Sequence, residues 1–145
     1  MRILKYLASA ILVIGLFTGC AQKNIGSNPA IDINVKNGKG AILVYRPHNS
    51  IWNHKRFNIY INGQFEDILM DKSHYIFNKK QGKYIIELRE DVDLKPEIFK
   101  VEVQLKEGKI RYIKFGTQFI EGHLKLRSVK KGIAKNDYDW GNGAY

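Results

Sequence analysis

The side chains that could perform acid–base or metal chemistry are scattered along the sequence. The 145-residue chain has 4 histidines, none at the spacing of a metal site. The acidic run 90–93 and Glu97 have the oxygen ligands that calcium prefers, but they lack the glycine and later acid of the known calcium loop. The sequence also has no nucleophile elbow, glycine-rich phosphate loop or H-E-x-x-H motif. We therefore expect no enzymatic activity, no metal and no bound cofactor.

The single cysteine has the most clearly defined chemistry in the chain. Cys20 follows Phe17, Thr18 and Gly19, and this run resembles the lipobox of bacterial lipoproteins, in which a bulky residue and two small residues precede the lipidated cysteine. Acyl chains on the thiol and on the new amino terminus would exceed the two hydrophobic signals that stable anchoring needs. One cysteine allows no intramolecular disulfide, so stability must come from a packed core. Covalent lipid on Cys20 is the only modification that we expect.

The residues before Cys20 have the pattern of a secretory signal peptide. Arg2 and Lys5 form a cationic head, and the apolar run after them is shorter than the ~20 residues of a membrane-spanning helix. We expect residues 1–19 to be removed and the lipid to hold the protein in the bacterial cell envelope. Because Ala21 stands where an aspartate would favour the inner membrane, the outer membrane is predicted, with the protein facing the periplasm. The alternative is an ordinary signal peptide or a short uncleaved anchor, in which Cys20 is incidental.

The remaining chain divides into a tether, one domain and a tail. Residues 20–39 comprise the lipidated cysteine and a segment rich in Asn, Gly, Ser and Lys, which is typical of a flexible tether. Apolar residues alternate over 30–36, so a first strand there is also compatible with the sequence. Residues 40–128 form the predicted domain, and 129–145 a mobile tail with a short helical turn near Ile133.

Short apolar segments separated by turn residues predict strands within this domain, because the three-and-four spacing of amphipathic helices is absent. The continuous apolar run 41–45 is typical of a strand buried on both faces, whereas alternation over 98–105 indicates one buried face. Seven to eight such strands favour an all-β fold, a small antiparallel β-sandwich. The aromatic residues on these strands, Tyr60 among them, are expected in its core. Hairpin turns are predicted at Asn62-Gly63, Lys80-Gln81-Gly82 and Lys106-Glu107-Gly108.

The order of these segments resembles a family of small bacterial envelope lipoproteins known as domain of unknown function 2846. The resemblance covers roughly residues 40–128 and implies a β-sandwich of the transthyretin-like or PEGA-like kind with no established activity. Its carriers are Val44-Tyr45-Arg46-Pro47, Ile59-Tyr60-Ile61-Asn62-Gly63, Gln81-Gly82-Lys83-Tyr84, Gly108-Lys109-Ile110-Arg111-Tyr112-Ile113 and Leu124-Lys125-Leu126.

Two segments have the composition of binding surfaces. The loop after the first strand places Trp52 among hydrogen-bonding residues, as in a loop that stacks on a sugar or peptide. The alternative is that Ile51 and Trp52 fold back and cap the open end of the sandwich. A basic face is predicted on the last two strands, with a merely soluble face as its alternative. The predicted loop residues are His48, Asn49, Trp52 and His54, and the predicted basic residues are Lys109, Arg111, Lys114, Lys125 and Arg127.

The net charge of +10 favours anionic partners. Nucleic acid is not expected, since a lipid-tethered protein without recognition motifs would not meet it, and no small-molecule substrate is identified. The leading hypothesis is a non-enzymatic binding module, attached to the membrane by lipid, that binds an envelope protein or an anionic surface polymer. One alternative is an accessory or structural lipoprotein of an envelope assembly with no ligand of its own. An enzyme acting on envelope material is the third.

Overall fold

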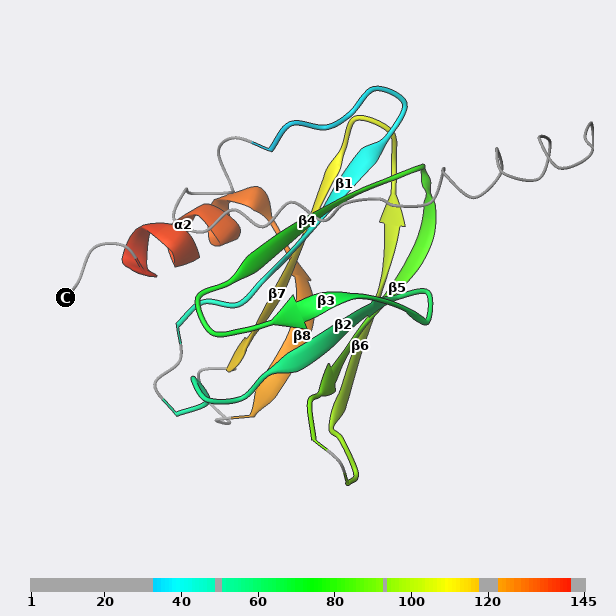
Figure 1. Cartoon of the computed structure of the whole chain (residues 1–145). Helices are drawn as coiled ribbons and strands as arrows, with labels where there is room; N and C mark the ends of the chain where they lie inside the picture. The colour runs from blue at the N-terminus through cyan, green and yellow to red at the C-terminus, as the bar shows by residue number, and fades with distance from the viewer. Residues whose placement is uncertain (1–32, 49–50, 93, 118–122, 142–145) are drawn as a thin grey trace, which may run out of the picture.

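The computed structural model describes residues 33–48, 51–92, 94–117 and 123–141 of the chain. The strands of this part form two four-stranded sheets that pack face to face as a β-sandwich, with helix α2 (Lys131–Gly141) on the outside (Figure 1). The strands are β1 (Gly40–Tyr45), β2 (Phe57–Ile61), β3 (Gln64–Leu69), β4 (His74–Lys79), β5 (Gly82–Glu90), β6 (Ile98–Leu105), β7 (Ile110–Thr117) and β8 (Leu124–Val129).

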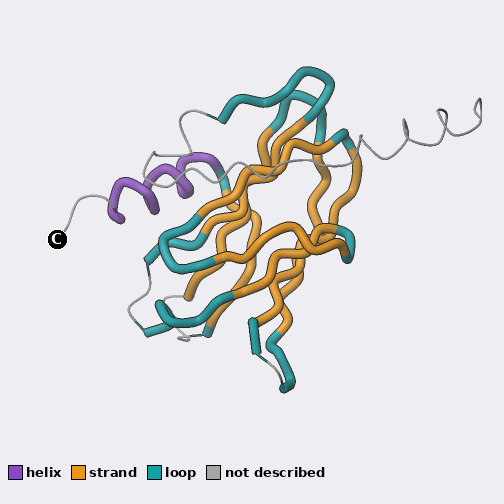
Figure 2. Tube along the Cα trace, viewed as in Figure 1, coloured by secondary structure: helices purple, strands orange, loops and turns teal. Residues whose placement is uncertain are grey.

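The two sheets have the strand orders β4-β1-β7-β8 and β3-β2-β5-β6, and we call them the first and second sheet. Within each sheet, neighbouring strands pair antiparallel, except that β1 and β7 run parallel at the centre of the first sheet. The layered arrangement is visible in the Cα trace (Figure 2). The predicted all-β sandwich is therefore confirmed, with one parallel pair that the sequence pattern did not indicate.

Of the three predicted hairpins, the one at Asn62-Gly63 is confirmed. Both residues have positive φ, 51° and 80°, as the tight turn between β2 and β3 requires. The other two predictions are wrong, because β4 to β5 and β6 to β7 each pass from one sheet to the other. A short turn shows that the chain reverses, but it does not show which sheet the next strand joins. That choice depends on burial: pairing with β2 and β6 places Ile86 and Leu88 of β5 fully inside the core between the sheets.

The main core lies between the two sheets. It contains alternate residues of the facing strands, including Ile42 and Ile59, and its centre is aromatic. Phe57 and Phe115 meet edge to face with ring centroids 4.6 Å apart, and Phe99 packs at 5.0 Å from Phe115. The edge-to-face geometry sets the positive ring edge against the negative ring face, which adds to the energy of burial.

The strand β1 is buried on both faces, as predicted, because a second apolar cluster covers the outer face of the first sheet. There Tyr45 packs with Ala134 of helix α2. The Tyr45 hydroxyl donates to Asp137 at 2.7 Å, and the Lys114 ammonium reaches the same carboxylate at 2.6 Å. These contacts attach α2 to the sheet, so the tail predicted for 129–145 is instead a docked helix over Lys131–Gly141.

Residues 33–36, for which a first strand was one alternative, form no strand. Ile33 and Val35 pack instead against the apolar cluster beneath helix α2. Residues 30–32 lie outside the described part of the chain. The segment continues upward in Figure 1 to the point where β1 begins.

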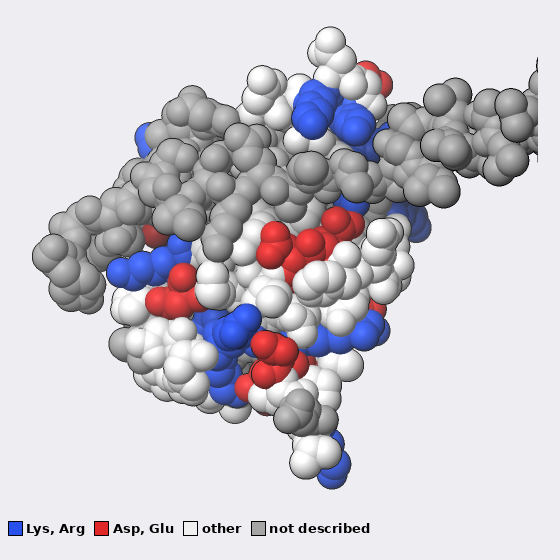
Figure 3. All heavy atoms as spheres, viewed as in Figure 1, with Lys and Arg blue, Asp and Glu red and all other residues white. Residues whose placement is uncertain are grey.

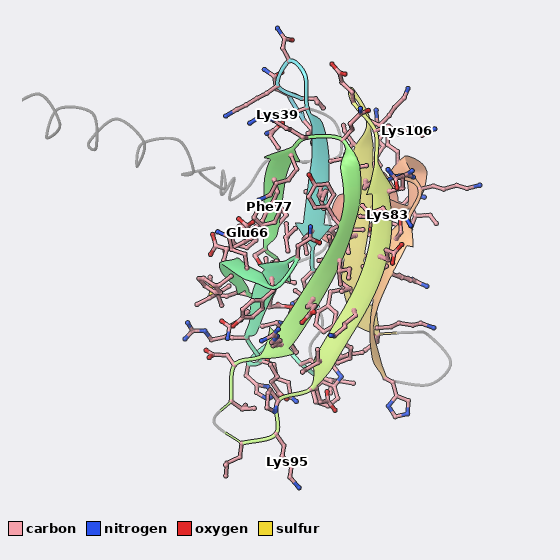
Figure 4. The ribbon with its side chains drawn as sticks, turned by 90° about the vertical axis from the view of Figure 1, so that its right-hand side faces the viewer. Lys39, Glu66, Phe77, Lys83, Lys95 and Lys106 are labelled. Atoms are coloured by element: carbon pink, nitrogen blue, oxygen red, sulfur yellow. The ribbon has the colours of Figure 1, made fainter. Side chains whose placement is uncertain are left out.

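Side chains close the open edge of the sandwich between β3 and β4. The Lys79 ammonium lies 2.5 Å from the carboxylate of Glu66, and the Tyr75 hydroxyl donates to the Ile68 carbonyl at 2.8 Å. Glu66 is free to turn toward β4 because a bulge interrupts the pairing of β3 with β2 at Ile59 and Tyr60. In Figure 4 the stick of Glu66 lies on this side of the molecule, near Phe77 of β4.

The buried hydroxyl of Tyr75 makes the domain less stable at alkaline pH. Burial, with a smaller contribution from Asp67, raises the pKa of Tyr75 from 10.0 to about 12. Its contribution to stability is therefore complete below pH 10 and is lost as the pH rises toward 12. Two pKa units correspond to about 2.7 kcal/mol.

We predict that the effect of Tyr75→Phe on the free energy of unfolding changes sign with pH. Near neutral pH the variant should be less stable than the wild type by about 1 kcal/mol, because the hydrogen bond to Ile68 is lost. Above pH 11 it should gain about 2 kcal/mol relative to the wild type. Denaturant unfolding of both proteins across this pH range measures the difference in their free energies of unfolding. The titration of other groups affects both proteins equally and cancels from this difference. A difference that stays constant with pH would contradict the prediction.

Candidate functional site

Four connections of the chain start and end at one end of the sandwich, which we call the loop end. They comprise residues 46–56, 70–73, 91–97 and 118–123, of which 49–50, 93 and 118–122 are outside the described residues. The strand register brings the flanking residues together, since Tyr45 pairs with His74, Arg89 with Ile98 and Thr117 with Leu124. In Figure 1 this end lies at the lower side of the molecule. Loops held by a rigid sheet are a common place for binding residues.

The guanidinium of Arg46 holds the largest of these loops in place. The Arg46 side chain is 1% exposed and is the largest fully buried side chain of the described residues. One of its terminal nitrogens donates to the Lys55 carbonyl at 2.6 Å, and the other donates to the Trp52 carbonyl. Its guanidinium also lies 5.3 Å from the ring centroid of Phe57. Burial lowers the pKa of Arg46, and the charge of Asp71 partly offsets this effect.

A histidine–carboxylate contact and an ion pair fix the same loop to its neighbours. The Nδ1 atom of His48 lies 2.5 Å from the carboxylate of Asp71, in the turn between β3 and β4. At the other end of the loop, the Lys55 ammonium lies 2.5 Å from Glu90 and 4.7 Å from the ring centroid of Trp52. These partly buried pairs leave few free charges on the loop. The loop end is therefore a pre-formed surface on which polar groups are largely satisfied by one another.

Two shallow hollows flank the Trp52 loop. One, of about 190 Å³, is lined by Trp52, Phe99, Leu124, Glu97 and His123. The indole of Trp52 is half-buried and lines this hollow beside Phe99 and Leu124, which pack on the core. The other hollow, of about 290 Å³, is lined by His54, Lys55, Arg56, Glu90, Asp91 and Val92.

Large apolar side chains project into solvent around these hollows. Ile51 is 69% exposed and Leu94 is 86% exposed, with Ile98 at 51% and Val92 at 45%. The alternative in which Ile51 folds back onto the core is thus wrong, whereas Trp52 is partly covered. Leu94 lies on the β5–β6 connection, which extends below the sheets as a separate finger in Figure 1. Several exposed apolar groups at one end of a domain are typical of a protein contact.

The residues of the predicted binding loop and basic face are only partly brought together. Trp52 and His54 line different hollows, His48 is engaged by Asp71, and Asn49 lies outside the described residues. The basic residues separate because successive side chains of a strand point to opposite faces. Lys114, Lys125 and Arg127 lie on the outer face of the first sheet, where Lys114 is neutralised by Asp137. Lys109 and Arg111 lie at the opposite end from the loops, where Arg111 donates to the Gln104 carbonyl at 2.7 Å.

The outer face of the second sheet is a surface that the sequence did not reveal. Tyr60 was expected in the core, but it lies on this face, with its ring 5.8 Å from that of Phe65 and 4.0 Å from the guanidinium carbon of Arg89. Arg89 also donates to Glu87 at 2.9 Å, and hydrogen bonds from Arg89 and Lys100 lower the pKa of Glu87. Phe65 remains 52% exposed. The bulge that shifts the pairing of β3 with β2 could not be predicted from the local sequence pattern.

The proposed lipidation site lies outside the described residues. Phe17, Thr18, Gly19 and Cys20 all belong to this undescribed amino-terminal part. Within the part that is described, no helix is long and apolar enough to span a membrane. Among the same residues, no group of three or more His, Cys, Asp or Glu side chains is placed to hold a metal ion.

Comparison with known proteins adds no relative. No protein-family model matches the chain, and no curated protein matches it. The resemblance to domain of unknown function 2846 therefore stays a prediction from the sequence.

Proposed function

We propose that the protein is a lipid-anchored module of the bacterial cell envelope that binds another envelope protein through its loop end. The observation that carries the proposal is the set of exposed apolar side chains there, above all Ile51 and Leu94. Arg46, the His48–Asp71 contact and the Lys55–Glu90 ion pair hold the loop that carries Ile51 in a fixed position, so little conformational entropy of that loop would be lost on binding. The lipid on Cys20 is part of the same proposal.

A protein partner is favoured over an anionic polymer by the charges of the loop end. The cations that border the two hollows are paired with acids, Lys55 with Glu90 and, more loosely, Arg56 with Asp91 at 3.8 Å. Polymer binding through the predicted basic face loses support, since its members lie on different surfaces. An apolar patch rimmed by paired charges is the usual composition of a protein interface.

The proposal predicts a single partner that contacts the loop end. A photo-reactive amino acid placed at position 51 or 94 should form one discrete cross-linked product in cells, and the same group at Gln64, an exposed residue beside the β2–β3 turn and away from the loops, should not. A product of equal yield from all three positions would indicate random encounters. No product from positions 51 and 94 would favour the accessory role without a ligand.

Substitution supplies the quantitative test. Burying a leucine or isoleucine side chain contributes about 1.5–3 kcal/mol, so Ile51→Asp and Leu94→Asp should each weaken partner binding by at least about 10-fold. Phe65→Asp is the matched control, because Phe65 is also an exposed apolar residue but lies on the outer face of the second sheet. Binding to the cross-linked partner is measured by titration. Equal losses for all of the variants would contradict a contact at the loop end.

A further inference from the structure

Cationic side chains gather at the end of the sandwich opposite the loops, which we call the turn end. The backbone places its segments side by side, since the amide of Gly108 donates to the Lys39 carbonyl and that of Ala41 to the Lys109 carbonyl, each at 2.9 Å. Gly82 of β5 pairs with Leu105 of β6 at the same level. The cations brought together are Lys36, Lys39, Lys80, Lys83, Lys106, Lys109 and Arg111.

These positive charges have little compensation. Glu107 is exposed among them, and Glu102 approaches Lys83 at 3.8 Å. Within the described part of the chain, no ion pair involves Lys39, Lys80 or Lys106, nor Lys36 or Lys109. In Figure 3 blue side chains cluster at the upper end of the visible face, above the start of β1. Like charges fixed this close together repel one another and attract an anionic surface.

The described chain begins at Ile33 beside the apolar cluster under helix α2 and then runs to the turn end. Residues 33–39 lead into β1, whose first residue, Gly40, sits against the Lys106 carbonyl. Figure 4 shows Lys39 and Lys106 at the end where β1 begins and Lys95 at the far end of the molecule. An anchor at Cys20 would therefore be joined to the domain through a segment whose last described residues belong to the turn end.

We infer that the turn end docks on the anionic headgroups of the membrane that carries the lipid anchor. The inference rests on the proposed lipid anchor, which brings the domain to that surface. Each lysine near an anionic membrane adds electrostatic attraction that decays within a Debye length, so docking requires low to moderate salt. With the turn end on the headgroups, the loop end with Leu94 points away from the membrane and is accessible to a protein partner.

Lysine footprinting of the full, cell-processed protein in vesicles tests the inference. One vesicle is pure phosphatidylcholine, and in the other about a third of the lipid is phosphatidylglycerol. A water-soluble amine-reactive reagent labels exposed lysines, which are then quantified by mass spectrometry. In anionic vesicles we expect the labelling of Lys39, Lys80 and Lys106 to fall about 10-fold relative to neutral vesicles and to recover in high salt. Lys72 and Lys95 at the loop end should keep their labelling.

Charge variants sharpen the result. Combining Lys39→Gln, Lys80→Gln and Lys106→Gln should abolish the protection of Lys36 and Lys109, whereas Lys72→Gln with Lys95→Gln, which also removes lysine charge, should leave it intact. Unchanged labelling in anionic vesicles, or equal protection of both ends, would overturn the inference. Failure of the protein to float with neutral vesicles would contradict the anchor itself, and the footprint in anionic vesicles would still decide whether the turn end docks.

Discussion

Replacing Arg46 with methionine should lower the free energy of unfolding by about 3–5 kcal/mol, the largest loss expected from a single substitution in the domain. Methionine fills much of the same space but donates no hydrogen bond, so the Lys55 carbonyl loses its guanidinium partner and the Trp52 carbonyl keeps only the Lys55 amide. The unsatisfied Lys55 carbonyl costs about 1–3 kcal/mol, the lost charge-assisted bond to the Trp52 carbonyl about 1.5–3 kcal/mol, and the lost contact with Phe57 about 1 kcal/mol. Denaturant unfolding measures the change.

Three comparisons isolate the role of the Arg46 guanidinium. Arg46→Lys keeps a positive charge but lacks the planar fork, so it should recover only part of the stability. Arg56→Met is the matched control, since Arg56 is half-exposed and 3.8 Å from Asp91, and it should cost less than about 1 kcal/mol. Hydrogen exchange of the Lys55 amide, which donates to the Trp52 carbonyl, should accelerate in Arg46→Met. Equal stability of Arg46→Met and Arg56→Met would show that the buried guanidinium does not hold the loop.

The importance of Arg46 could not be inferred from its sequence position. It follows a fully apolar strand and precedes Pro47, and this pattern predicts only that the strand ends there. Its burial arises because the loop turns back over it and supplies two carbonyl acceptors from residues six and nine positions later. Local pattern cannot show such a closure, although an arginine directly after a doubly buried strand is a signal worth testing.

The strands themselves were predictable because alternation and turn residues are local. Leu124 and Leu126 face inward and Lys125 and Arg127 outward, as their alternation indicates. Sheet membership was not predictable, since the parallel pairing of β1 with β7 joins residues about seventy positions apart. Helix α2 was underestimated for a related reason. Its own sequence is weakly apolar, and its position depends on Tyr45 and Lys114, which are distant in the chain.

The sequence already indicated that the residues of the predicted basic face lie on different faces. Arg111 and Lys114 are three positions apart on one strand, so their side chains must leave opposite faces. The turn-end cluster was not within reach, because its cations come from turns that link different sheets. Lys39 and Lys106 lie together only through the crossing of β6 into β7 beside the start of β1. A prediction of charged surfaces therefore requires the topology first.

Cys20→Ser should abolish lipid attachment completely. A serine hydroxyl is far less nucleophilic than a cysteine thiol, so the thioether bond to the lipid cannot form. Processing by a lipoprotein-specific peptidase should then stop, and the protein should keep residues 1–19. Growth with a labelled fatty acid, followed by intact-mass measurement, reports both steps. Phe17→Leu is the control, since it keeps a bulky apolar residue before the two small ones and should be labelled like the wild type.

The same experiment separates the anchor from its alternative. If Cys20 were incidental to an ordinary signal peptide, the wild type would carry no label and the serine variant would be cut to the same mature mass. Label on the serine variant would place the lipid elsewhere. With the anchor in place, acyl chains contribute about 0.8 kcal/mol for each buried methylene group, far more than the salt-sensitive attraction of the turn-end lysines. Under the two proposals, the lipid would therefore set whether the domain is at the membrane, and the lysines would set which way it faces.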